Sequence, residues 1–259
     1  MDTIFSEKGQ KKLDALIKKG TLCAFDFDGT LAPIVNRHQN AYLPPPIAKQ
    51  LATLASLTPV AILTGRAIKD IRPRLPFTPH YLIGNHGLEG IPGWEKHEQH
   101  YRHLCAQWHH AIQNALSTSP ENHNHIEIEN KQLSLSIHYR HAANPAQTGK
   151  TLLALLKENA PDAFIMPGKY LYNLVPPDAP DKGAALNEIM KTSKAPAVLY
   201  VGDDITDENI FRLSWNNLLS IRVEKDLASA APWYIPTHQD ITKLLDHLIN
   251  RIQSQNGLP

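Results

Sequence analysis

Short apolar runs and helix-like patterns alternate along the first part of the chain and again near its end. Apolar runs that predict buried strands lie at residues 22–27, 60–63, 81–83, 198–201 and 218–223. Apolar residues at helical spacing predict helices near residues 47–57, from residue 67, and near residues 182–190, 208–213 and 239–252. Strands that alternate with helices are typical of a parallel sheet covered by helices. The sequence therefore predicts an α/β core.

The middle of the chain has a different pattern. Its segments follow in the order helix, hairpin, helix and hairpin, at residues 98–116, 126–139, 149–158 and 164–175, with the second hairpin turning at Pro167-Gly168. The first hairpin segment alternates apolar and polar residues, as strands of an antiparallel sheet with one face in water do. We therefore expect residues 1–86 and 177–259 to form the core, and residues 87–176 to form an inserted α/β domain that contains antiparallel sheet.

Polar side chains gather where predicted strands end or a helix begins. They are Asp26 and Asp28 after the first strand, Thr64 and Arg66 after the second, Lys182 at a helix start, and Asp203, Asp204 and Asp207 after a later strand. Open α/β sheets bind ligands at the carboxyl ends of their strands, so these side chains are expected to face one crevice. Carboxylates as close as Asp26 and Asp28 repel each other unless a cation or a proton relieves the repulsion.

This set of residue types suits phosphoryl transfer. Its transition state spreads negative charge over three oxygens, so catalysis consists mostly of positioning and charge neutralisation. Mg²⁺ prefers oxygen ligands and takes one or two protein carboxylates. One carboxylate could attack phosphorus through an acyl-phosphate, while a second acid protonates the leaving alkoxide and then activates water.

The order of these motifs resembles that of a known superfamily. Asp26-x-Asp28-Gly-Thr, Thr64, Lys182 and Gly-Asp203-Asp-x-x-Asp207 look like the four motifs of haloacid dehalogenase phosphatases. The inserted domain lies between the second and third motifs, like the C2-type cap of that superfamily. Residues 26–34, 63–66, 84–89 and 202–208 resemble signatures of the trehalose-6-phosphate phosphatase family. The resemblance implies a Rossmann-like core with a cap that sets substrate specificity.

The resemblance also implies an activity and catalytic residues. The chain is expected to be a phosphoric monoester hydrolase of trehalose biosynthesis, which converts trehalose 6-phosphate to trehalose and phosphate through an aspartyl-phosphate. Asp26 would be the nucleophile and Asp28 the general acid/base. Thr64 and Lys182 would bind the transferring phosphoryl group.

A magnesium site is implied in the same way. The Asp26 carboxylate, the Asp28 backbone carbonyl and Asp203 would hold Mg²⁺. Asp207 would position Lys182 or a metal-bound water. Asp204 and Arg66 are expected to support the site, together with Asp207.

Sugar recognition is expected to involve a different group of residues. The family's cap carries a Gly-Lys-x-x-x-Glu motif whose Lys and Glu contact sugar hydroxyls. Lys169 matches that Lys, but Asn173 stands where the family has Glu. Asn can donate and accept hydrogen bonds, yet it lacks the charge of Glu. His86 and Glu89, in a glycine-rich segment, are expected to face the sugar, or else to form only a structural turn.

Several alternatives remain open at this point. The substrate could be another glycosyl phosphate, such as sucrose 6-phosphate, mannosyl-3-phosphoglycerate or glucosylglycerol phosphate, because Asn173 departs from the family motif. A phosphosugar mutase would need the same acids, and a silent sugar-phosphate sensor would need only the binding residues. Residues 144–151 are a near miss to a phosphate-binding P-loop, without its first glycine.

Composition narrows the classes of partner and compartment. The net charge is +1 and no long basic block is present, so we expect no nucleic-acid partner. No apolar run approaches the roughly 20 residues of a membrane span, and the polar, Lys-rich first residues lack the apolar centre of a signal peptide. Cys23 and Cys105 are expected to be buried, reduced thiols. We expect a cytoplasmic monomer whose partner is a small sugar phosphate.

Overall fold

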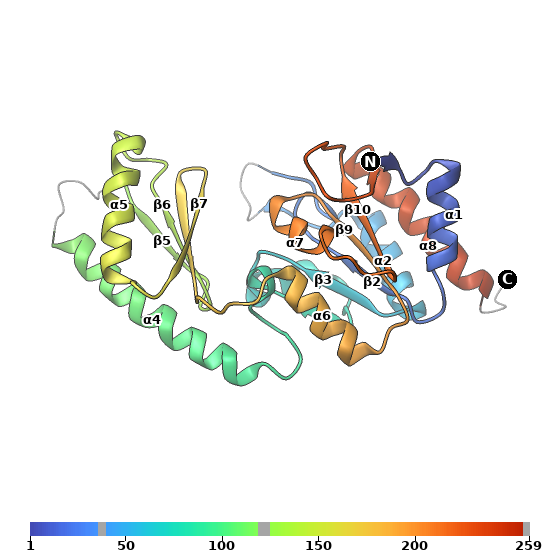
Figure 1. The fold of residues 1–259 in the computed structure, drawn as a ribbon, viewed down its shortest axis with the longest axis horizontal. Helices are drawn as coiled ribbons and strands as arrows, with labels where there is room; N and C mark the ends of the chain where they lie inside the picture. Colours follow the sequence, from blue (N-terminus) through green and yellow to red (C-terminus); the bar gives the residue numbers. More distant parts are fainter. Residues whose placement is uncertain (36–39, 119–124, 256–259) are drawn as a thin grey trace. The chain divides into compact units, whose positions relative to one another are not determined.

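The computed structural model describes residues 1–35, 40–118 and 125–255. It forms two compact units, the first comprising Met1–Pro92 and Pro180–Pro259 and the second Gly93–Ala179 (Figure 1). The second unit contains most of the segment that the sequence predicts to be an insertion. Each unit has its own sheet and its own apolar core.

The first unit is built on a parallel sheet of seven strands in the order β1-β11-β10-β9-β2-β3-β4. These strands are β1 (Asp2–Thr3), β2 (Leu22–Phe25), β3 (Val60–Leu63), β4 (Tyr81–Ile83), β9 (Val198–Gly202), β10 (Leu218–Val223) and β11 (Trp233–Ile235). Every residue of β2, β3 and β9 is buried, as expected for the central strands of a sheet that is covered on both faces. The neighbours β9, β2 and β3 all run in the same direction, so their carboxyl ends meet at one edge.

Helices complete the first unit. They are α1 (Glu7–Leu16), α2 (Pro45–Leu57), α3 (Ile68–Ile71), α6 (Lys182–Ser193), α7 (Glu208–Phe211) and α8 (Ile241–Gln255). Leucines of α1, α2 and α8 join side chains of the strands in one apolar cluster, for example Leu13, Leu54 and Leu248. Fully burying a leucine contributes about 1.5–3 kcal/mol. This packing holds the sheet rigid beneath the loops at the edge of its strands.

The second unit is an antiparallel sheet packed against two helices. Its strands, in the order β5-β6-β8-β7, are β5 (Glu127–Asn130), β6 (Leu135–His138), β8 (Leu171–Val175) and β7 (Phe164–Gly168). Helices α4 (Glu95–Ser117) and α5 (Pro145–Asn159) supply Trp108 and Leu152 to an apolar cluster with Ile137 of the sheet. The predicted α/β core and the antiparallel sheet in the middle of the chain are both confirmed.

Some details differ from the predicted pattern. The sequence analysis did not predict β1, α1 or β11. The second hairpin turns at Lys169-Tyr170, because Pro167 and Gly168 are still paired with Tyr172 and Leu171. Residues 144–151 form the cap and first turns of α5, with the Asn144 side chain accepting the Gln147 N–H, so a helix stands where a phosphate loop would be.

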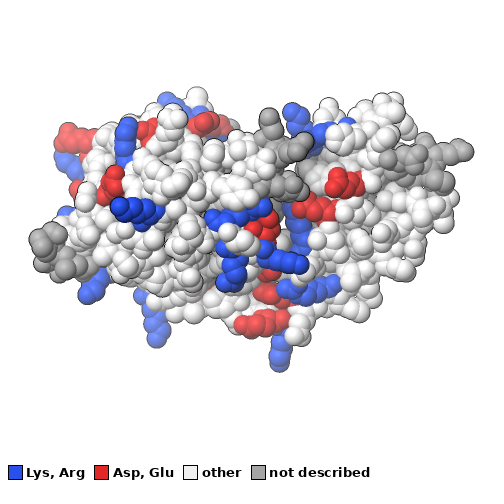
Figure 2. All heavy atoms as spheres, turned by 180° about the vertical axis from the view of Figure 1, so that it is seen from behind, with Lys and Arg blue, Asp and Glu red and all other residues white. Residues whose placement is uncertain are grey.

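Other sequence-based expectations concern the surface and the thiols. Cys23 and Cys105 are both buried and free, and burial raises the pKa of each thiol to about 12. Within the three described ranges, no helix is both long and apolar enough to cross a membrane. On the face shown in Figure 2, acidic and basic side chains are interspersed, in line with the near balance of 26 basic and 25 acidic residues.

Candidate active site

Asp26 lies at the edge of the sheet, directly after β2, and is 5% exposed. Its backbone N–H donates to the Val201 carbonyl of β9 at 2.9 Å, which continues the sheet pairing by one residue. The Phe27 N–H donates to Asp26 Oδ1 at 2.7 Å, and Lys182 Nζ lies 3.1 Å from Oδ2. Burial raises the pKa of Asp26, and the Lys182 ammonium opposes that rise. The carboxylate is therefore fixed in direction, with one oxygen beside a cation.

Asp203 follows β9 and reaches the same edge. Thr30 Oγ1 donates to Asp203 Oδ1 at 2.8 Å. Gly29, with φ of +82°, makes room for this side chain, because a Cβ at position 29 would lie 2.0 Å from Asp203 Oδ2. Burial is the main cause that raises the pKa of Asp203 to about 6, and the Asp207 carboxylate adds to it. A cation beside Asp203 would relieve this penalty.

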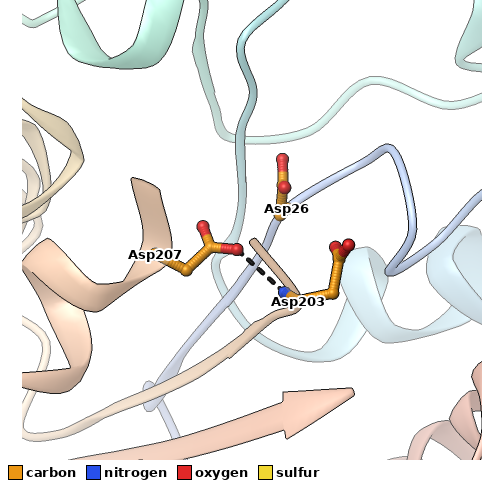
Figure 3. Close-up of side chains that lie close together, drawn as sticks. All are labelled: Asp26, Asp203 and Asp207. Atoms are coloured by element: carbon orange, nitrogen blue, oxygen red, sulfur yellow. Dashed lines mark hydrogen bonds between the residues drawn. The ribbon is translucent and has the colours of Figure 1, made fainter. Parts of the chain in front are cut away.

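Asp207 and Lys182 form a buried ion pair behind Asp26. Lys182 Nζ donates to Asp207 Oδ1 at 2.7 Å, and Tyr200 Oη donates to the same oxygen at 2.6 Å. The Asp203 N–H donates to Asp207 Oδ2 at 2.8 Å (Figure 3). The Asp204 N–H donates to the same oxygen at 2.9 Å. Burial alone would lower the pKa of Lys182, but the two carboxylates outweigh it and raise that pKa. Lys182 is therefore a permanent cation.

The three acids form a group that could hold a metal ion. Asp26, Asp203 and Asp207 each offer an oxygen within 4.8 Å of the others (Figure 3). Four donors already occupy the two oxygens of Asp207, so Asp26 and Asp203 are the carboxylates better able to bind a cation. Two carboxylates in one cavity fit the oxygen chemistry of Mg²⁺, which commonly keeps waters and substrate oxygens as its other ligands.

Asp28 is held at the site by a guanidinium. Arg66 donates from Nε to Asp28 Oδ2 and from Nη2 to Oδ1, both at 2.7 Å. Arg66 Nη1 donates to Asp70 Oδ2 at 2.6 Å, and Asp70 also accepts from Arg74. Such a two-point pairing fixes the plane as well as the position of a carboxylate. The Asp28 carboxylate is therefore presented in one orientation.

The acids and Lys182 surround one cavity of about 320 Å³. Its lining comprises Asp26, Asp28, Ile34, Gly65, His86, Lys182, Asp203, Asp204 and Thr206. The structure thus brings together most of the core residues that the sequence predicts for the site. Thr64 is fully buried beneath it, and its Oγ1 accepts the Arg66 N–H at 3.2 Å.

The glycine-rich segment after β4 holds His86 at the cavity. His86 has a left-handed backbone, with φ of 58°, and its ring lies so close to Gly65 that a Cβ there would be 2.3 Å from Cε1. Glu89 Oε2 accepts the Ile68 N–H at 2.8 Å and the Asn85 amide at 2.9 Å. This oxygen of Glu89 is thus engaged in holding the loop to the start of α3, while His86 faces the cavity.

The two predicted sugar ligands of the inserted domain belong to the second unit. Lys169 is exposed in the turn between β7 and β8. Asn173 lies on β8, and its Oδ1 accepts the Ser136 hydroxyl of β6 at 2.6 Å. That bond fixes the orientation of the Asn173 amide.

Three residues with a place in these networks were missed by the sequence analysis. Thr30 orients Asp203, Asp70 anchors Arg66, and Tyr200 donates to Asp207. The four-residue spacing of Arg66, Asp70 and Arg74 was a detectable signal, because opposite charges at that spacing often pair. In the structure Arg66 precedes α3 and Arg74 follows it. Tyr200 gave no comparable signal, because an aromatic residue in an apolar run predicts ordinary packing.

Known proteins resemble this chain over most of its length. A family model described as Trehalose-phosphatase matches residues 24–233. A trehalose-phosphate phosphatase of Mycobacterium tuberculosis (strain H37Rv) is 28% identical over 255 residues, which cover 93% of this chain and 64% of that protein. This chain thus spans a little under two thirds of the length of that relative.

Solved structures show the same fold. The crystal structure of a trehalose-6-phosphate phosphatase related protein is similar with a TM-score of 0.70 and 20% identity, covering 89% of this chain and 97% of that one. A trehalose-6-phosphate phosphatase of Aspergillus fumigatus is similar with a TM-score of 0.62 and 23% identity, covering 96% and 99%.

Proposed function

This chain belongs to the trehalose-phosphatase family, and from that premise we propose that it hydrolyses trehalose 6-phosphate to trehalose and phosphate. The observation that carries the proposal is the Asp26 carboxylate, held between the Phe27 N–H and Lys182 at the cavity, with Asp203 beside it. This arrangement offers a fixed nucleophile, a permanent cation and a second acid for a metal ion.

In the proposed first step, an oxygen of Asp26 attacks phosphorus and the bond to the sugar oxygen breaks. Asp28 gives its proton to the departing sugar oxygen, which leaves as a neutral alcohol. Lys182 lies 3.1 Å from Asp26 and would offset the repulsion between that carboxylate and the phosphate dianion. The product of this step is a phosphoryl group bound to Asp26.

In the proposed second step, Asp28, now a carboxylate, takes a proton from water, and the resulting oxygen attacks phosphorus. Free Asp26 and inorganic phosphate are formed, and Asp28 regains its proton. Arg66 would keep Asp28 oriented while it is a carboxylate, because its two donors hold both carboxylate oxygens. When bound, Mg²⁺ would supply positive charge for the phosphoryl oxygens, with Asp26, the Asp28 carbonyl and Asp203 as its protein ligands.

Supporting roles are proposed for further residues in and around the cavity. Thr64 would position the Arg66 backbone, since its hydroxyl accepts the Arg66 N–H. Asp204 would help to anchor Asp207, to which its N–H donates. His86, which lines the cavity, would contact the substrate near its phosphate end, and Glu89 would hold the loop that carries His86.

The second unit is proposed to be the cap that recognises the sugar, with Lys169 and Asn173 as its ligands. One observation favours a second candidate substrate. The Asn173 oxygen already accepts the Ser136 hydroxyl, and its amide adds an N–H donor that a Glu carboxylate lacks. This difference supports, as a second candidate function, hydrolysis of another glycosyl phosphate by the same site.

Phosphate release from a panel of sugar phosphates tests both candidates. The panel contains trehalose 6-phosphate, sucrose 6-phosphate, glucosylglycerol phosphate and mannosyl-3-phosphoglycerate, each assayed with Mg²⁺ and with EDTA. We expect the highest kcat/KM with trehalose 6-phosphate and its loss in EDTA. A higher kcat/KM with another member of the panel would make that sugar phosphate the preferred substrate. Asn173→Glu should then shift the preference toward trehalose 6-phosphate. No release from any member would contradict the proposed function.

A further inference from the structure

Tyr200 places a single hydroxyl in the otherwise apolar strand β9. The residue is fully buried, and its ring packs edge-on against Phe211 with 6.0 Å between the ring centroids. Its hydroxyl donates to Asp207 Oδ1 at 2.6 Å. Burial and the neighbouring carboxylates raise the pKa of Tyr200, so it remains a protonated donor. A buried phenol bonded to a carboxylate at the catalytic edge needs a physical explanation beyond packing.

The same oxygen of Asp207 serves two donors. Lys182 Nζ donates to Asp207 Oδ1 at 2.7 Å, and that ammonium also lies 3.1 Å from Asp26 Oδ2. An oxygen that accepts a hydroxyl has less negative charge to offer to an ammonium. The bond from Tyr200 therefore weakens the attraction of Asp207 for Lys182, and more of the ammonium's charge is available to Asp26.

We propose that Tyr200 is a positioning residue that acts through Asp207 to hold Lys182 between Asp207 and Asp26. The catalytic consequence rests on the proposed function, in which Asp26 attacks phosphorus beside Lys182. The proposed effect of Tyr200 on the position of Lys182 does not depend on that function, because it concerns only the contacts of Lys182 in the resting protein. Without the hydroxyl, Asp207 Oδ1 has Lys182 as its remaining side-chain donor in the described structure, and the ammonium moves toward it and away from Asp26.

Tyr200→Phe isolates this effect. The substitution keeps the ring and its packing against Phe211, and removes only the hydroxyl. Tyr101→Phe is the matched control, because Tyr101 is also almost completely buried and its hydroxyl donates at 3.2 Å to the Asp178 carbonyl in the second unit. Both variants lose one buried phenol hydroxyl, but Tyr101 lies outside the network of Lys182.

Steady-state kinetics with the best substrate of the panel and saturating Mg²⁺ is the first measurement. Loss of one charge-assisted hydrogen bond from the network is expected to lower kcat of Tyr200→Phe about tenfold while KM stays within about twofold. Tyr101→Phe is expected to stay within about twofold of wild type in both constants. In an Asp207→Asn background, Tyr200→Phe should have almost no further effect on kcat, because its route to Lys182 is already lost.

Crystal structures of wild type and Tyr200→Phe form a second test that needs no turnover. The distance from Lys182 Nζ to Asp26 Oδ2 is expected to lengthen beyond about 3.5 Å in the variant, past the range of a hydrogen bond. An unchanged distance together with an unchanged kcat would overturn the proposal. A wild-type protein that hydrolyses no sugar phosphate would contradict the proposed function, while the distance would still decide the role of Tyr200.

Discussion

Gly29→Ala is predicted to disable the proposed metal site through one methyl group. Gly29 has φ of +82°, and a Cβ there would lie 2.0 Å from Asp203 Oδ2 and 2.4 Å from Cγ. An L-residue in this backbone region costs roughly 1–2 kcal/mol before any clash. The clash itself forces Asp203 out of its place, which also breaks its bond with Thr30. The variant should therefore lose both folding stability and metal binding.

Gly20→Ala separates these two effects. Gly20 also has φ of +82°, but its nearest neighbour to a new Cβ is Pro196 Cδ at 3.7 Å, an ordinary contact. It should lose only the backbone contribution of about 1–2 kcal/mol, which for a chain of this size lowers Tm by about 2–4 °C. Its kcat should remain close to that of wild type.

The assay is thermal unfolding with EDTA and with millimolar Mg²⁺, combined with phosphate release. Wild type and Gly20→Ala should show the same rise of Tm on adding Mg²⁺, whereas Gly29→Ala should show almost none and lose more than about a hundredfold in kcat, which corresponds to about 2.7 kcal/mol. A Gly29→Ala protein with a wild-type Mg²⁺ response would refute the assignment of Asp203 as a metal ligand.

Three further predictions concern the same acids. Because burial raises the pKa of Asp203 to about 6, protons compete with Mg²⁺ below that pH, so the rise of Tm on adding Mg²⁺ should be complete above pH 7 and should shrink as pH falls through 6. Without metal the sign reverses: the unfolded carboxyl titrates near 3.8, so ionising Asp203 disfavours folding and its contribution to stability falls as pH rises from about 4 to 6. Thr30→Val removes a bond that lowers the pKa of Asp203, and should move the Mg²⁺ response to higher pH in the same titration. Arg66→Lys keeps the positive charge but loses the two-point pairing with Asp28. It should lower kcat at least tenfold, while Mg²⁺ should raise Tm about as much as in wild type. An unchanged kcat would show that Arg66 does not position Asp28.

The sequence predicts that the acids of the candidate site lie at one edge of the sheet, because their positions follow from topology. Asp26 and Asp203 each come directly after a buried apolar run, and parallel strands place such positions at one edge. The pairing of β2 with β9 then brings together two residues that are far apart in the chain. No side-chain detail is needed for that prediction.

The bonds within the site are not predictable in this way. Asp28 follows the same strand as Asp26, yet its carboxylate is bound by Arg66. This pairing depends on where α3 begins, because Arg66 lies just before that helix. The sequence analysis expects Glu89 to face the sugar or to form part of a turn, and only the structure shows that one oxygen of its carboxylate accepts the Ile68 N–H. Tyr200 has the pattern of a core aromatic, and only the position of Asp207 turns its hydroxyl into a donor to the site.

Two of the three elements that the sequence analysis did not predict, α1 and β11, have other physical reasons. Helix α1 has many polar residues, and its buried side is narrow, formed by Gly9, Leu13 and Leu16. A Cβ at Gly9 would lie 2.4 Å from the Ile4 carbonyl oxygen, so a glycine that suggests a turn serves close packing instead. Strand β11, Trp233–Ile235, is too short for an apolar run to stand out between two prolines.

The central claim is that Asp26 attacks phosphorus in a sugar phosphate. The most direct measurement is acid quenching during turnover of trehalose 6-phosphate, followed by peptide mass spectrometry, in wild type and in Asp26→Asn. A phosphoryl group on Asp26 of wild type is expected, with no such adduct in the variant and no measurable phosphate release by it. The claim would be contradicted if Asp26→Asn retained more than about a tenth of the wild-type rate, a change of under 1.4 kcal/mol in the barrier.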